Sequence, residues 1–139
     1  MTADRSAPGG EFPARTYRIT RSDLAEYAAA SGDDNPIHLD AGAAADAGLP
    51  GVVAHGMLVM ALAGRAVRDW TGRSDALVSF DLRFTRYVVV SDEDGAGLTV
   101  SGRRSDAGAD SADALAKIAV TVRDDARAVV ARASAVVRM

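Results

Sequence analysis

Cysteine is absent from this 139-residue sequence, which excludes disulfides, thiolate chemistry and cysteine-based zinc or iron–sulfur sites. Lysine occurs once, at Lys117, and the 19 acidic residues outnumber the 16 basic ones. The formal net charge of -3 argues against nucleic acid as a partner, because such binding usually needs a clear basic excess. No apolar run reaches the ~20 residues that span a bilayer, so no membrane association is expected.

The N-terminal residues contain no apolar segment of the kind found in secretory signals, and a cytoplasmic location is therefore expected. The length, with 48% hydrophobic and 25% charged residues, suits one globular domain with one core. Small and polar residues dominate the start of the chain, together with Pro8 and Pro13. This composition predicts a flexible tail over residues 1–14 and a single domain over residues 15–139.

The first half of the domain shows mainly helical signals. A short strand is expected at residues 16–19, followed by a helix that begins at Thr20 and ends at Gly32. Asp40 has the character of an N-cap for a second short helix over residues 41–47. Residues 56–70 are apolar or small on almost every side, which predicts a buried helix.

The second half shows strand signals instead. Residues 78–85 alternate between apolar and polar side chains, as in a half-buried strand, and further strands are expected at 98–104, 116–123 and 128–137. Helices followed by antiparallel strands predict an α+β fold in which a curved antiparallel sheet wraps around one central buried helix. One helix cannot cover every apolar surface of such a sheet, so a dimer joined at sheet edges is also expected.

Asp33 and His38 are the strongest candidates for chemistry. They lie five residues apart across a turn that contains Pro36, a spacing that can place a carboxylate beside an imidazole. Such a pair can hold a water molecule, remove its proton and return a proton to a neighbouring atom. Histidine suits this task because its unperturbed pKa of ~6.5 lies close to the working pH. An aspartate and a histidine near a turn are more often solvated or capping groups, so the spacing alone does not establish catalysis.

Gly56 and His55 raise a second possibility. Gly56 opens the apolar helix, so its N–H has no intrahelical acceptor and lies at the positive end of the helix dipole. Without a side chain in the way, a carbonyl oxygen can approach this N–H, which makes it a candidate oxyanion hole. For His55, a structural hydrogen bond is as reasonable as a ligand contact.

At these residues the sequence resembles the MaoC-like (R)-specific hydratases and dehydratases, which have the hot-dog fold. The resemblance rests on the segments Tyr27-Ala28-Ala29-Ala30-Ser31-Gly32-Asp33-Asp34-Asn35-Pro36-Ile37-His38 and Ala54-His55-Gly56-Met57-Leu58. Residues 24–70 and 80–89 are similar to the catalytic B subunit of the actinobacterial (3R)-hydroxyacyl-ACP dehydratase. The resemblance covers most of residues 16–138.

Carried over by position, the resemblance makes Asp33 and His38 the catalytic dyad and Gly56 the backbone donor to the thioester carbonyl. Asn35 is implied to support the loop, while His55 and Met57 are assigned to substrate binding or loop support. The implied reaction is dehydration of an (R)-3-hydroxyacyl thioester on ACP or CoA, or the reverse hydration, in fatty acid or polyketide elongation. No metal or cofactor is implied. The implied partners are the acyl carrier and a second hot-dog subunit, in a homodimer or heterodimer.

Two alternatives remain open. Other hot-dog proteins hydrolyse acyl-CoA thioesters, although the spacing of Asp33 and His38 argues against this. A non-catalytic stabilising subunit of a heterodimer is the other alternative, and an intact dyad argues against it. Asp34 stands where the family often has an apolar residue, and a second carboxylate there can raise a neighbouring pKa.

Overall fold

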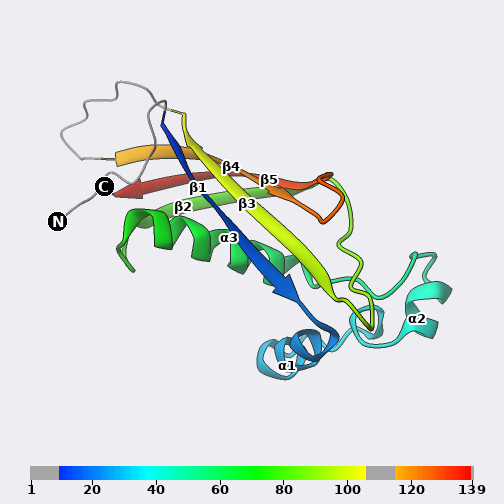
Figure 1. Ribbon diagram of the computed structural model, residues 1–139. Coiled ribbons are helices and arrows are strands. Elements are labelled where there is room, and N and C mark those ends of the chain that lie inside the picture. The colour runs from blue at the N-terminus through cyan, green and yellow to red at the C-terminus, as the bar shows by residue number, and fades with distance from the viewer. Residues whose placement is uncertain (1–9, 106–114, 139) are drawn as a thin grey trace.

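The computed structural model describes residues 10–105 and 115–138, which form one antiparallel sheet and three α-helices (Figure 1). The elements follow in the order β1 (Glu11–Ile19), α1 (Arg21–Ser31), the 3₁₀ turn η1 (Pro36–His38), α2 (Ala41–Asp46), α3 (Gly56–Thr71), β2 (Leu77–Phe84), β3 (Ala96–Arg104), β4 (Leu115–Arg123) and β5 (Val129–Arg138).

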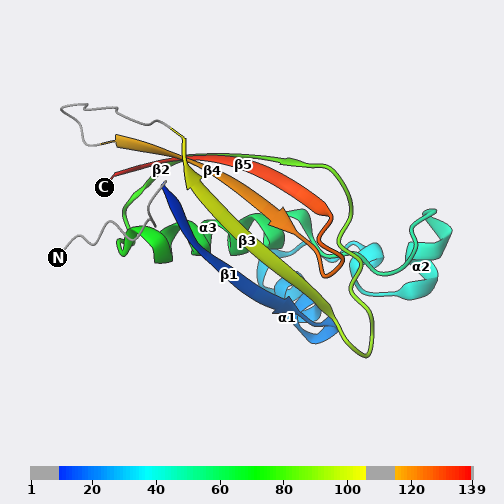
Figure 2. The ribbon, with the colours of Figure 1, turned by 45° about the horizontal axis from the view of Figure 1, so that its top comes forward.

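The five strands are arranged in the order β1-β3-β4-β5-β2, and every neighbouring pair is antiparallel. Helix α3 lies along one face of the twisted sheet, while α1 and α2 gather at the end where α3 begins (Figures 1 and 2). The predicted hot-dog architecture, a curved antiparallel sheet around a central helix, is therefore confirmed.

Alternation along the strands builds the core between the sheet and α3. In β4, for example, Ala116, Ile118, Val120 and Val122 are buried. They meet the sheet-facing side of the helix, where Val59, Ala63, Ala66, Val67 and Trp70 are buried. The period of two in the strand and the helical spacing in α3 thus give each element one apolar face.

The start of the sheet differs from the expectation. β1 begins at Glu11, so residues 11–14, expected in the tail, belong to the strand; residues 1–9 lie outside the described residues. Phe12 is buried and stacks on Trp70 with a ring centroid distance of 5.2 Å. The indole Nε1–H also donates to the carbonyl of Pro13 at 2.7 Å. These contacts with α3 outweigh the local preference of prolines and small residues for irregular structure.

The helix ends follow the sequence closely. Thr20 and Asp23 form the predicted capping box, and Gly32 ends α1 with a φ of 80°, which glycine adopts without strain. Asp40 caps α2 by accepting hydrogen bonds from the N–H groups of Gly42 and Ala43. None of the helices in the described ranges has both the length and the apolar character needed to cross a bilayer.

The apolar surface of α3 and β2 is less covered than expected. In the single chain the sheet buries only one side of α3, and Met57 on the other side is 63% exposed. β2 is an edge strand, and its large side chains Leu77, Val78 and Phe84 are 40%, 46% and 45% exposed. The expectation that α3 is buried on all sides is therefore wrong for one chain, because a single sheet covers a single helix face.

Candidate active site

The turn between α1 and α2 carries the predicted acid–base pair. Gly32 ends the helix, and Asn35 then caps η1 by accepting a hydrogen bond from the Ile37 N–H through its side-chain oxygen. Pro36 occupies the first position of the turn, where its missing N–H costs nothing. This local chemistry reverses the chain between Asp33 and His38. Asn35 therefore makes a hydrogen bond within the loop, and its support of the dyad stays a prediction.

His38 is held from the segment that precedes α3. Its Nδ1 lies 2.7 Å from the carbonyl oxygen of Val53, and the Val53 N–H donates in return to the Ile37 carbonyl at 3.2 Å. Because a carbonyl oxygen only accepts, Nδ1 donates in this contact, and in the neutral ring Nε2 then carries the lone pair. His38 is buried, whereas Asp33 is solvent-exposed. The geometry thus gives a fixed imidazole whose Nε2 is available as a base.

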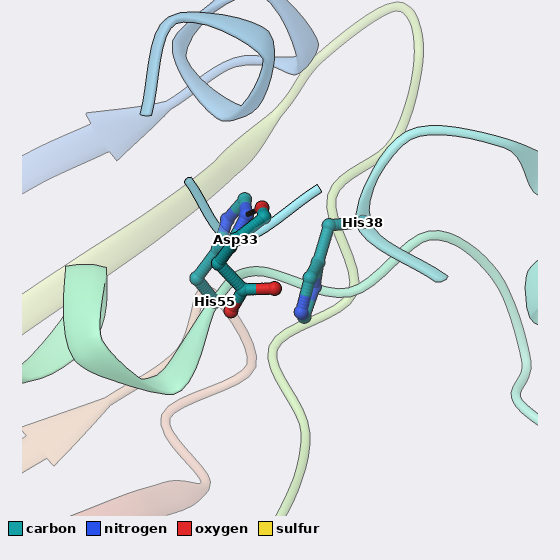
Figure 3. Close-up of side chains that lie close together, drawn as sticks. All are labelled: Asp33, His38 and His55. Atoms are coloured by element: carbon teal, nitrogen blue, oxygen red, sulfur yellow. Dashed lines mark hydrogen bonds between the residues drawn. The ribbon is translucent and has the colours of Figure 1, made fainter. Parts of the chain in front are cut away.

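Asp33, His38 and His55 converge, as Figure 3 shows. One carboxylate oxygen of Asp33 and one ring nitrogen of each histidine all lie within 4.8 Å of one another. No direct hydrogen bond joins the Asp33 carboxylate to the His38 ring within the described residues, and at such a separation one water molecule can bridge the two groups. The two side chains that the turn was expected to bring together are therefore neighbours.

The same three residues each offer one atom of a type that can bind a metal ion. The imidazoles of His38 and His55 are stacked, with centroids 3.9 Å apart and planes inclined by 25°. Nearly parallel rings direct their in-plane lone pairs side by side rather than at one point. Each ring also uses one nitrogen in a hydrogen bond to a backbone carbonyl. A metal ion would therefore find one nitrogen of each ring available, on two stacked imidazoles.

The N-terminus of α3 faces the same region. The N–H groups of Leu58 and Val59 donate to the His55 carbonyl, so the N–H of Gly56 precedes the first helical hydrogen bond. A Cβ atom at Gly56 would lie 3.2 Å from two ring atoms of Phe84. The missing side chain therefore lets Phe84 pack against the helix start while the backbone N–H stays accessible.

A cavity of about 470 Å³ connects these features. Its walls are mainly apolar, and Arg86 is the one permanently charged side chain among the residues that line it. The lining residues are Ile37, His38, Val53, Ala54, Gly56, Val59, Phe84, Thr85, Arg86, Tyr87 and Val88. His38 and Gly56 thus share one pocket, and Asp33 places a carboxylate oxygen within 4.8 Å of a nitrogen of the His38 ring.

Three backbone segments distant in sequence hold this pocket together. The N–H of Ala54 donates to the Val88 carbonyl at 2.9 Å, and the N–H of Val90 donates to the Val52 carbonyl at 2.8 Å. Residues 52–54 therefore join η1 to residues 88–90. No local pattern in the sequence points to Val53 or to residues 84–88 as walls of a pocket. The only signal for that wall was the resemblance over residues 80–89.

The remaining predicted residues lie around the pocket. His55 is almost fully buried behind His38, and its Nε2 donates to the backbone carbonyl of Asp33 at 3.0 Å. Met57 is exposed and is not among the residues that line the cavity, so its assigned role stays a prediction. Asp34 is exposed, and Asp40 is the helix cap that its position indicated.

The pocket has what proton transfer next to a carbonyl requires. A water between Asp33 and His38 can lose a proton to Nε2, and an oxygen beside Gly56 can accept its N–H while gaining negative charge. Apolar walls around these few polar groups suit a substrate with an aliphatic part.

Two proteins of named activity are similar to this chain in sequence. A 3-hydroxyacyl-thioester dehydratase X of Mycobacterium tuberculosis is 37% identical over 78 residues, which cover 56% of this chain and 27% of that protein. An (R)-specific enoyl-CoA hydratase of Aeromonas caviae is 32% identical over 98 residues, or 70% of this chain and 73% of that protein. The chain thus spans about a quarter of the mycobacterial relative and most of the Aeromonas relative.

Solved structures share the fold. A MaoC-like dehydratase superimposes with a TM-score of 0.88 at 34% identity, covering 94% of this chain and 40% of that one. A chain of the (3R)-hydroxyacyl-ACP dehydratase complex HadBC from Mycobacterium tuberculosis gives a TM-score of 0.69 at 21% identity, covering 99% of both chains, and this likeness shows the fold alone. The model of the MaoC like domain matches residues 4–122. With most of its length matched by that model, and with the wrapped-helix fold in place, this chain belongs to the MaoC-like domain family.

Proposed function

We propose that this protein is an (R)-3-hydroxyacyl thioester dehydratase that also catalyses the reverse reaction, hydration of a trans-2-enoyl thioester. The observation that carries the proposal is the convergence of Asp33 and His38 beside an apolar cavity that Gly56 also lines. The names of the Mycobacterium and Aeromonas relatives, a dehydratase and an enoyl-CoA hydratase, support the same reaction class.

In the hydration direction, water binds between the Asp33 carboxylate and His38 Nε2. The imidazole removes a proton as the water oxygen bonds to C3 of the enoyl group. The electrons of the double bond move toward the thioester, and the Gly56 N–H stabilises the negative charge on its oxygen. The acid–base pair then delivers a proton to C2, so that H and OH are added across the double bond. Dehydration runs these steps in reverse.

The proposal also concerns which carrier holds the acyl group, ACP or CoA, and which pathway the reaction serves. Fatty acid and polyketide elongation both need a dehydratase for 3-hydroxyacyl groups on an acyl carrier protein, whereas a CoA-linked hydratase acts on the enoyl thioester of CoA. Matched assays with the same acyl group on ACP and on CoA distinguish the two carriers. The higher kcat/KM then identifies the carrier that the protein uses.

We also propose that the protein functions as a dimer with a second hot-dog subunit, which is either identical or different. The support is the exposed apolar edge at β2, where Leu77, Val78 and Phe84 are each at least 40% exposed. Phe84 also lines the cavity, so a subunit paired along β2 would close one of its walls.

Incubation of the pure chain with crotonyl-CoA tests the reaction. We expect the absorbance of the conjugated thioester to fall while no CoA is released. Because the protein has no cysteine, a thiol reagent reports only free CoA. Release of CoA would instead indicate a thioesterase. No reaction, either alone or with a candidate partner subunit, would indicate a non-catalytic chain.

A further inference from the structure

His55 is the most deeply buried polar residue near the pocket, at 1% exposure, and the proposed mechanism gives it no proton to move. Four observations describe its surroundings: one hydrogen bond, two ring contacts and one nitrogen without a partner. His55 is the N-cap residue of α3. From there its ring contacts both Asp33 and His38.

The hydrogen bond fixes the tautomer of His55. Nε2 donates to the carbonyl oxygen of Asp33 at 3.0 Å, so this nitrogen carries a proton. Nδ1 is buried and has no hydrogen-bond partner within the described part of the chain. A second proton on the ring would therefore be a buried donor without an acceptor, which is costly. The contacts of the ring are thus those of the neutral tautomer with its proton on Nε2.

The ring face of His55 supports His38. Its plane lies nearly parallel to that of His38, with centroids 3.9 Å apart, while Tyr27 of α1 meets it edge-on at 4.7 Å. A neutral aromatic face attracts a neighbouring cation, whereas a second imidazolium would repel it. The stack is therefore compatible with a transient positive charge on His38 only while His55 stays neutral.

We propose that His55 is a positioning residue that acts as a neutral ring: its Nε2–H holds the backbone of Asp33, and its face holds the imidazole of His38. The titratable groups that face it are Asp33 and His38 from the loop and Tyr27 from α1, and Arg86 lines the cavity that His38 shares. The inference rests on the proposed hydro-lyase reaction, in which the distance between Asp33 and His38 must match one water molecule.

Two substitutions separate the two contacts. His55→Gln keeps a side-chain N–H near the Asp33 carbonyl but removes the ring, whereas His55→Phe keeps a ring but removes the donor. Glu26→Gln, at an exposed position of α1, is the matched control. We expect both His55 variants to lower kcat by about 10- to 100-fold, the scale expected for misplaced catalytic groups. KM should change by less than about twofold, because the thioester contacts remain.

Two further measurements do not depend on turnover. The ring-nitrogen NMR spectrum of the wild type at pH 7 should show His55 as the neutral Nε2–H tautomer. Amide exchange of Ile37 and His38 should accelerate in His55→Phe, because the Asp33 carbonyl loses its donor. The inference would be overturned if His55 were protonated or carried its proton on Nδ1. Unchanged amide exchange together with normal kcat in both variants would also overturn it. An inactive wild type with the expected tautomer and exchange would instead overturn the proposed reaction alone.

Discussion

At the scale of single residues, Asp33 and His38 are held by different means. The His38 ring is buried and fixed by the Val53 carbonyl and the His55 stack. Asp33 is exposed, and among residues 10–105 and 115–138 its carboxylate accepts one weak local hydrogen bond, from the Asn35 N–H at 3.4 Å. The base is thus rigid, whereas the carboxylate depends on the backbone of its loop for position. This difference makes the loop contacts of Asp33 as important as the side chain itself.

The pair can be tested by removing one function at a time. We expect Asp33→Asn and His38→Ala each to lower turnover of crotonyl-CoA by at least ~100-fold, the usual scale of general acid–base catalysis. Asp34→Asn is the matched control, since it removes an adjacent exposed carboxylate and should leave turnover nearly unchanged. Melting temperatures close to that of the wild type must accompany the losses. Near-normal turnover in either folded variant would exclude that residue from the acid–base pair.

The turn between Asp33 and His38 allowed this pair to be predicted from the sequence. Five residues separate Asp33 from His38, and the intervening turn follows from Asn35 and Pro36. The partners of His38 could not be found in the same way. Val53 and His55 lie 15 and 17 residues further along the chain and reach the ring only because residues 52–54 join η1 to residues 88–90. Contacts of this kind depend on tertiary packing and leave no local pattern.

At the scale of elements, periodicity predicted which segments form strands and helices, but not which faces are covered. β2 alternates like a half-buried strand, and Phe80 and Leu82 do pack against the core. Its terminal apolar residues are exposed because the strand lies at the sheet edge. Strand order is set by pairing between distant segments, which the alternation of a single strand does not encode. The early start of β1 has a similar origin, in the contact of Phe12 with Trp70.

Packing between β3 and α3 gives a stability test with an internal control. A Cβ atom at Gly102 would lie 2.4 Å from the Trp70 ring, whereas one at Gly64 would meet nothing within 4 Å. We expect Gly102→Ala to destabilise the fold by ~1–3 kcal/mol, the usual cost of overpacking. Gly64→Ala should stabilise it by up to ~1 kcal/mol, because alanine favours the helix. Denaturant unfolding of both variants measures this, and equal stabilities would contradict the described contact.

The acyl path can be tested on the same helix. The small side chains of Ala61, Ala63 and Gly64 would either leave room for an acyl chain along α3 or only allow the helix to pack closely on the sheet. In the structure, Ala63 is fully buried in the core, and none of these three lines the cavity that contains His38. Val59 does line it. The cavity therefore reaches α3 at Val59, closer to the start of the helix than these three residues.

Substitution at Val59 should therefore change chain-length preference. We expect Val59→Phe to reduce kcat/KM for long enoyl thioesters far more than for crotonyl-CoA, because added bulk shortens the cavity. Ala63→Phe, the matched control, adds bulk to the packed core and should lower the melting temperature, at a cost of ~1–3 kcal/mol. Its activity should fall equally for short and long substrates. A uniform loss in Val59→Phe would place the acyl chain elsewhere.

At the scale of the whole molecule, the exposed edge at β2 determines the assembly that we expect. An edge strand with unpaired backbone groups and large apolar side chains is a template for another strand. Phe84 belongs to this edge, lines the cavity and packs against Gly56. Pairing along β2 would therefore cover the apolar edge and enclose the substrate in one step. The same contact should link assembly to activity.

We accordingly expect the active protein to be a dimer at micromolar concentration, with itself or with a second hot-dog subunit. Val78→Asp places a carboxylate on the exposed apolar edge and should shift the protein toward monomer, with a parallel loss of turnover, because burying an unpaired charge is unfavourable. Ala119→Asp, at an exposed position of the central strand β4, is the control and should leave assembly intact. Light scattering gives the mass, and activity measured across a dilution series shows whether turnover follows the dimer. A stable monomer with full activity would show that one chain alone forms a complete site.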